Sequence, residues 1–123
     1  MLREFSKVRQ QKGGFRRLFA DEYFDLYLWY RFRWGRIRGF QLCYDKDRNY
    51  HSLTWTRDSG YRHESVDDGD CGGGPKRSPI LIPDGSFNRA ALAHRFREAS
   101  GRMPRRLRDF VQHTILAYVD DVP

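Results

Sequence analysis

Arginine and aromatic residues alternate between positions 29 and 38. The stretch reads Trp29-Tyr30-Arg31-Phe32-Arg33-Trp34-Gly35-Arg36-Ile37-Arg38. Exposed rings can stack on nucleic-acid bases, and guanidinium groups can contact phosphates. The candidate phosphate contacts are Arg31, Arg33, Arg36 and Arg38, and the candidate stacking residues are Trp29 and Trp34. The alternative is a hairpin whose arginines lie along the rings for packing and solubility.

A second group of arginines stands at the start of the last predicted helix, where the helix dipole is positive. It consists of Arg105, Arg106 and Arg108, while Asp120 and Asp121 follow the other end. Positive charge at the start of a helix and negative charge at its end both interact unfavourably with the helix dipole, at a cost of a few tenths of a kcal/mol for each charge. Phosphates at the arginines, or an antiparallel copy of the same helix in a two-fold dimer, would offset this cost. The alternative is screening by solvent.

His63 and the acidic residues that follow it are the weak candidates for a metal site. The candidates are His63, Asp67, Asp68 and Asp70, with Glu64 and Cys71 beside them. In a strand, His63 and Glu64 point to opposite faces, so the stretch is better interpreted as a solvated turn. We therefore predict no metal, no cofactor and no catalytic residue.

Residues 92–104 read Leu-Ala-His-Arg-Phe-Arg-Glu-Ala-Ser-Gly-Arg-Met-Pro. This pattern of Leu92, Phe96, Gly101 and Pro104 resembles the second helix-turn-helix of AraC-type transcription regulators. The resemblance covers only this segment, and it implies that the two C-terminal helices bind DNA. A Gly-x-x-Pro link also suits any two short helices that meet at an angle.

Alternating apolar residues predict the strands that must position these groups. Residues 23–33 give the clearest case, with a predicted core row of Phe24, Leu26, Leu28, Tyr30 and Phe32. Further strands are expected over 15–20, 37–44, 50–57, 61–66 and 79–83. Short polar turns between the strands make them antiparallel neighbours. Residues 67–77 contain four glycines and predict a mobile loop.

Helices are expected at both ends of this sheet region 15–83. Leu2, Phe5 and Val8 have a spacing of three, which predicts a short helix within residues 1–13. A C-terminal helical pair is expected over 87–119, with Asp84 or Ser86 capping its first helix. The fold class is therefore α+β: an antiparallel β-meander of five to six strands with two C-terminal helices packed on one face.

Composition is consistent with a single domain over residues 1–123. The net charge is +7, and 15% of residues are aromatic. No apolar run is long enough to span a bilayer, so we expect no membrane association. Two cysteines, Cys43 and Cys71, give no disulfide framework, and reduced thiols in a cytoplasmic protein of bacterial type are the simpler interpretation.

The basic surface favours an acidic partner, with nucleic acid as the first candidate. We therefore predict a small non-catalytic binding domain. One alternative is a homodimerising structural or protein-interaction module. Another is a metal-dependent enzyme centred on His63 and Asp67–Asp70.

Overall fold

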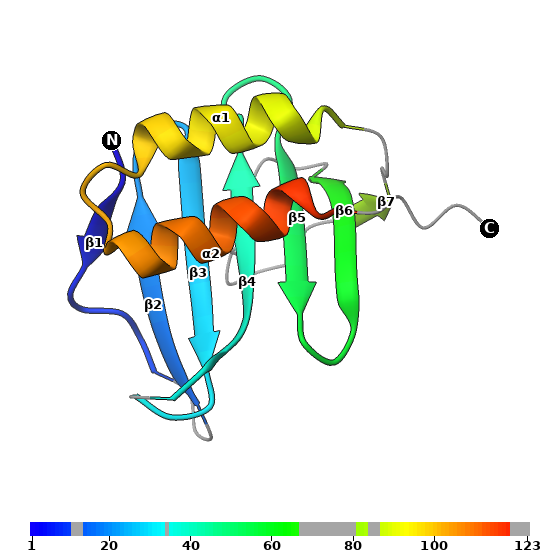
Figure 1. Ribbon diagram of the computed structural model, residues 1–123. Helices are drawn as coiled ribbons and strands as arrows, with labels where there is room; N and C mark the ends of the chain where they lie inside the picture. Colours follow the sequence, from blue (N-terminus) through cyan, green and yellow to red (C-terminus); the bar gives the residue numbers. More distant parts are fainter. Residues whose placement is uncertain (11–13, 34, 67–80, 84–86, 119–123) are drawn as a thin grey trace.

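The structure is a computed structural model that describes residues 1–10, 14–33, 35–66, 81–83 and 87–118. Seven strands within these ranges form one antiparallel sheet, in which the strands follow one another in chain order (Figure 1). The strands are β1 (Arg3–Phe5), β2 (Phe15–Ala20), β3 (Phe24–Tyr30), β4 (Ile37–Tyr44), β5 (His51–Thr56), β6 (Gly60–Val66) and β7 (Leu81–Pro83). The predicted meander is confirmed, and the predicted loop 67–77 lies outside the described residues.

The start of the chain differs from the prediction. A helix was expected within residues 1–13, but Arg3–Phe5 pair with β2 as a seventh strand. Leu2 is fully buried in the core, and its N–H donates to the carbonyl of Ala99 at 2.8 Å. The helical spacing of Leu2, Phe5 and Val8 is a weak local preference. Pairing with β2 satisfies backbone groups that an isolated short helix would leave open.

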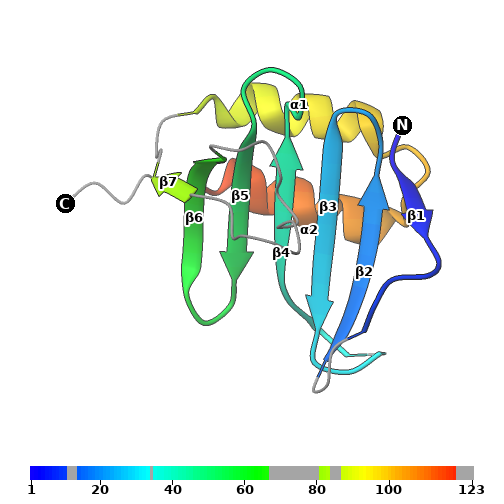
Figure 2. The same cartoon turned by 180° about the vertical axis from the view of Figure 1, so that it is seen from behind.

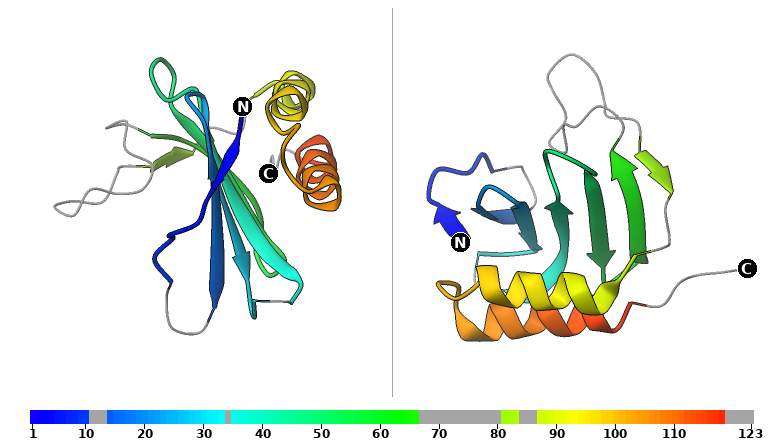
Figure 3. Two further views of the ribbon diagram at one scale, coloured as in Figure 1. Left: turned by 90° about the vertical axis from the view of Figure 1, so that its left-hand side faces the viewer. Right: turned by 90° about the horizontal axis from the view of Figure 1, so that it is seen from above.

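Two helices follow the sheet, as expected. They are α1 (Arg89–Ala99) and α2 (Arg105–Leu116), and both lie on one face of the sheet (Figure 3). Asn88 caps α1, because its Oδ1 accepts the N–H of Ala91 at 3.0 Å. The expected cap at Asp84 or Ser86 was therefore wrong by at least two positions. No helix in the described part of the chain is long and apolar enough to cross a membrane.

The arrangement of α1 and α2 differs from that of a helix-turn-helix. The two helices run antiparallel and side by side across the sheet (Figure 1). In a helix-turn-helix the second helix crosses the first at a steep angle and enters the major groove. Here α2 instead buries Leu107, Val111 and Ile115 in the core. The resemblance over residues 92–104 therefore reflects how a helix ends and the next begins.

The core lies between the helices and the sheet. One row of side chains from each central strand faces the helices: Phe24, Leu26, Leu28, Phe40, Leu42 and Leu53 are all fully buried. Phe96 of α1 meets Phe24 edge-on, with ring centroids 6.0 Å apart. Each such side chain contributes roughly 1.5–3 kcal/mol on burial, so this layer holds the helices on the sheet.

The other face of the sheet is seen in Figure 2, where the strands lie in front of the helices. Tyr27 and Trp29 are half-buried there. Cys43, Ser52 and Glu64 are paired neighbours across β4, β5 and β6, and all three are buried. Cys43 is disulfide-bonded, which contradicts the expectation of reduced thiols. The other cysteine of the chain, Cys71, lies outside the described residues.

Candidate functional site

The predicted phosphate contacts of the first group lie at one end of the sheet. β3 ends at Tyr30 and β4 begins at Ile37, so residues 31–33 and 35–36 lie between the two strands, beyond the end of the ladder. Arg31, Arg33 and Arg36 are exposed on this connection, and Arg38 is exposed at the start of β4. The turn between β5 and β6 lies at the same end (Figure 1) and adds the exposed Arg57.

Few acidic groups neutralise these arginines. Nη2 of Arg38 lies 3.2 Å from Oδ2 of Asp58, but both side chains are more than half exposed, so the pair contributes less than about 1 kcal/mol. Nε of Arg57 donates to the carbonyl of Ile37 at 2.8 Å. Among the described residues, neither Arg31 nor Arg36 nor Arg57 has a carboxylate partner. This end of the sheet therefore carries uncompensated positive charge.

Two hollows flank Arg38. The first, of about 370 Å³, lies beside Trp29, Gly39 and Thr56. The second, of about 750 Å³, is lined by Arg31, Phe32, Arg36, Ile37, Arg38, Arg57 and Asp58. Both hollows have guanidinium groups in their walls.

Gly39 keeps the space beside Trp29 open. The two residues face each other across the β3–β4 pair. A Cβ at position 39 would lie 2.5 Å from the carbonyl oxygen of Trp55 and 2.9 Å from Cγ2 of Thr56. Only glycine fits there without displacing β5. The indole of Trp29 thus borders a hollow on the face away from the helices. Trp34, the other predicted stacking residue, lies outside the described residues.

Phe32 is exposed, although the alternation of residues 23–33 predicts it in the core row. Because β3 ends at Tyr30, the alternation of the strand does not extend to position 32, and 66% of Phe32 is exposed. The guanidinium of Arg31 lies 5.5 Å from the centroid of its ring. The arginines on both sides of Phe32 were the signal that could have identified it as a surface residue.

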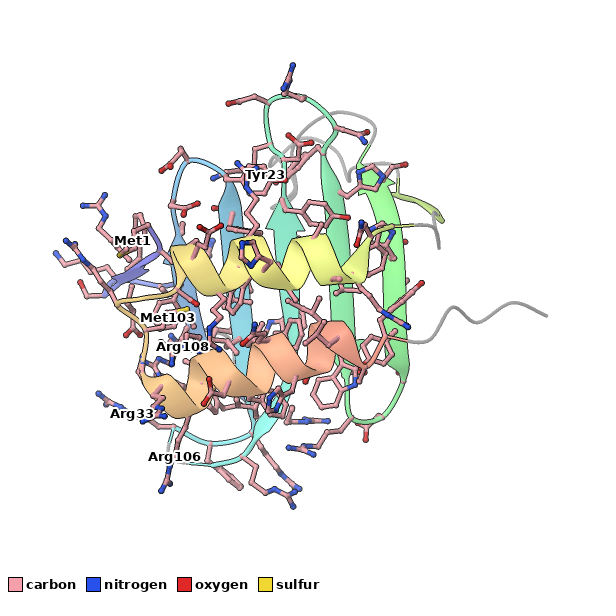
Figure 4. The ribbon with its side chains drawn as sticks, turned by 45° about the horizontal axis from the view of Figure 1, so that its top comes forward. Met1, Tyr23, Arg33, Met103, Arg106 and Arg108 are labelled. Carbon is pink, nitrogen blue, oxygen red and sulfur yellow. The ribbon has the colours of Figure 1, made fainter. Side chains whose placement is uncertain are left out.

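The arginines of α2 divide into two kinds. Arg105 and Arg106 are exposed in a first turn that has no acidic residue and no side-chain cap. Arg108 is half-buried, and its Nε has no hydrogen-bond partner among the described residues. Figure 4 shows Arg33 and Arg106 at the same lower-left corner of the molecule. Asp120 and Asp121 lie outside the described residues. We define the basic surface as Arg31, Arg33, Arg36, Arg38, Arg57, Arg105 and Arg106.

The structure does not assemble the weak metal candidates. His63 is 4% exposed, and it faces the helices from β6. Glu64 points to the opposite face, as the strand period predicted. Asp67, Asp68 and Asp70 lie outside the described residues. Within the described ranges, no group of three or more His, Cys, Asp or Glu side chains is placed to hold a metal ion.

A pocket of about 520 Å³ lies at the opposite end of the sheet, where the residue pattern predicts no site. Four rings form a stacked column in its wall: Tyr44, His51, His63 and Phe87, with centroids of successive rings 5.8, 5.2 and 4.1 Å apart. The hydroxyl of Tyr44 lies 2.5 Å from Nε2 of His63, and Nδ1 of His51 lies 2.8 Å from the carbonyl of Asn49. The column depends on the pairing of three strands, which residue spacing alone does not give.

Comparison with known proteins gives no relative: no family model, no curated protein and no solved structure matches the chain. Function must therefore be argued from these two sites.

Proposed function

We propose that this chain is a small nucleic-acid-binding domain that uses its basic surface. The observation that supports this most strongly is one hollow lined by arginines from two separate segments of the chain, namely Arg31, Arg36 and Arg38 on one side and Arg57 of the turn after β5 on the other. Arg106, in the first turn of α2, lies at the same corner of the molecule as Arg33 in the view of Figure 4. Exposed guanidinium groups attract polyanions, because each contact with a phosphate releases a condensed counterion.

The aromatic residues near these arginines favour a single-stranded ligand. Trp29 borders one hollow and Phe32 lines the other. A ring can stack on a base only when the base has left its helix, and such stacking tolerates any base. In a duplex, the bases would be out of reach of both rings. Phosphate contacts by arginine with stacking by Trp29 and Phe32 therefore describe sequence-tolerant binding of an unpaired strand.

The salt dependence of binding tests this proposal. We expect a fluorescently labelled single-stranded oligonucleotide to bind at low salt. The logarithm of its association constant should fall linearly with the logarithm of the salt concentration. Each phosphate contact on a single strand contributes about −0.7 to that slope, so five contacts would give about −3.5. A duplex of the same sequence should bind more weakly. Absence of binding to either at low salt would refute the proposal.

Two pairs of substitutions separate a specific surface from general positive charge. Arg36→Gln with Arg106→Gln removes two charges from the basic surface. Arg48→Gln with Arg97→Gln removes two exposed charges elsewhere, from the turn between β4 and β5 and from α1. The first pair should reduce the slope by about 1.4, twice the value for one contact. Equal weakening by both pairs would mean that net charge alone drives binding.

The homodimer alternative can be tested by light scattering on the wild type and on the variant with Arg36→Gln and Arg106→Gln. It predicts that the wild type is a dimer and that these substitutions either dissociate or strengthen the dimer. Such a change without any nucleic-acid binding would assign the basic surface to a second copy of the chain and overturn the proposal.

A further inference from the structure

The pocket at the other end of the sheet is a second candidate site, well separated from the basic surface. It lies between α1, which lines it from Ala91 to Glu98, and the end of the sheet that carries Tyr44 and His51. Figure 4 shows Tyr23, one of its lining residues, at the top of the molecule, far from Arg33 and Arg106. Its volume of about 520 Å³ falls within the range of small-molecule sites in proteins.

Two nearly buried histidines form part of the pocket wall. His51 is 6% exposed and His63 is 4% exposed, and both lie on the face of the sheet that packs against the helices, beside Leu53. Their hydrogen bonds to the Asn49 carbonyl and the Tyr44 hydroxyl fix the two rings in their planes. Polar groups that are already oriented bind a ligand at a lower entropic cost. The wall therefore combines aromatic surface with preorganised hydrogen-bonding groups.

A single positive charge stands at the mouth of the pocket. The guanidinium carbon of Arg95 lies 3.6 Å from the ring centroid of Tyr23, which holds the side chain in place. Among the described residues, Arg95 has no carboxylate partner. Glu98 lines the same pocket, but its Oε1 lies 3.4 Å from Nε2 of His94. An anion could thus pair with Arg95, while Glu98 would repel a ligand with several negative charges.

We propose that this pocket binds a small aromatic carboxylic acid. The carboxylate pairs with the guanidinium of Arg95, whose planar fork matches it in two parallel hydrogen bonds. The aromatic ring packs among Tyr44, His63 and Phe87. A polar substituent on that ring would be recognised by the side chain of Asn49. This inference does not depend on the proposed nucleic-acid binding, because the two sites share no residue.

Benzoate is a suitable probe, with the imidazoles as reporters. In protein with ¹⁵N-labelled histidine, we expect added benzoate to shift the side-chain signals of His51 and His63. His113 is exposed on α2 and outside the pocket, so its signal should stay in place. Benzamide has the same ring without the charge, and it should bind at least about tenfold more weakly. Inorganic phosphate should leave both buried histidines unchanged.

Substitutions on α1 test the role of Arg95. Arg95→Met should weaken benzoate binding about tenfold or more, because a charge-assisted hydrogen bond is lost. Arg97→Met is the matched control, since it removes the same charge from an exposed position of the same helix outside the pocket. The proposal fails if benzoate shifts neither histidine or if Arg95→Met binds it as tightly as the wild type. Tighter binding of phosphate than of benzoate would also overturn it, because that would identify a site for inorganic anions.

Discussion

Gly39 is the position at which one added methyl group should do most damage to the sheet. In Gly39→Ala the new Cβ would lie 2.5 Å from the carbonyl oxygen of Trp55 and 3.1 Å from Cα of Thr56. Both are backbone atoms of β5, and Gly39 pairs directly with Thr56, so no side chain can rotate away to relieve the clash. Overpacking of this kind costs about 1–3 kcal/mol.

This cost converts into a measurable fall in the midpoint of thermal unfolding, Tm. At about 2.1 cal/mol/K per residue, a chain of 123 residues has an unfolding entropy of about 0.26 kcal/mol/K. A loss of 1–3 kcal/mol therefore lowers Tm by about 4–12 °C. Calorimetry or the circular dichroism of the sheet would measure it.

Two other glycines provide controls for the same substitution. At Gly101 an added Cβ would meet only the flexible end of Met1, with Cε at 3.5 Å, so Gly101→Ala should leave Tm nearly unchanged. Gly60 has open space around it but a φ of +74°, so Gly60→Ala should cost about 1–2 kcal/mol through backbone strain alone. An unchanged Tm for Gly39→Ala, or an equal fall for Gly101→Ala, would refute this account of how β4 and β5 pair.

Three further predictions concern stability. Asn88→Ala removes the acceptor for the N–H of Ala91 and should cost about 1 kcal/mol in urea unfolding, whereas an unchanged midpoint would contradict the assigned cap. Phe96→Ala leaves a cavity in the core and should cost about 3–5 kcal/mol, and a loss below 1 kcal/mol would contradict its central place. Burial raises the pKa of Tyr23 and Tyr61 above the ordinary 10.0. The unfolded chain loses these protons first, so stability is retained below pH 10 and falls as pH rises through the raised values. Equal urea midpoints at pH 9 and pH 11 would contradict this.

The sheet was predictable because its strands alternate and its turns are short. The six strands from position 15 onward follow the predicted order, and only their ends moved by a few residues. β1 was missed because three residues carry little periodic signal. Its formation depends on the free edge of β2 and on a core site for Leu2, which are tertiary effects.

The basic surface was predictable only in outline. Composition and spacing identified the arginines, but exposure depends on where an element ends and which way a helix faces. Phe32 is exposed because β3 stops two residues earlier, and Arg108 is half-buried because α2 turns that position inward. Neither the end of β3 nor the side of α2 that faces the sheet can be predicted from the residue types alone.

The histidine pocket was not predictable, because its members come together through strand pairing. His51 pairs with Tyr44 across β4 and β5, and His63 pairs with Leu53 across β5 and β6. A shift of one residue in either pairing would place a histidine on the opposite face. The register must therefore be known to within one residue, so the column could be found only in the assembled sheet.

The most direct test of the central claim is a map of where a nucleic acid binds. Backbone amide signals would be followed by NMR while a short single-stranded oligonucleotide is added at low salt. We predict shifts at residues 31–33, 35–38, 57–59 and 105–106, with little change around residues 45–51 at the other end of the sheet. Shifts centred on residues 45–51, or spread evenly over the surface, would contradict binding at the basic surface.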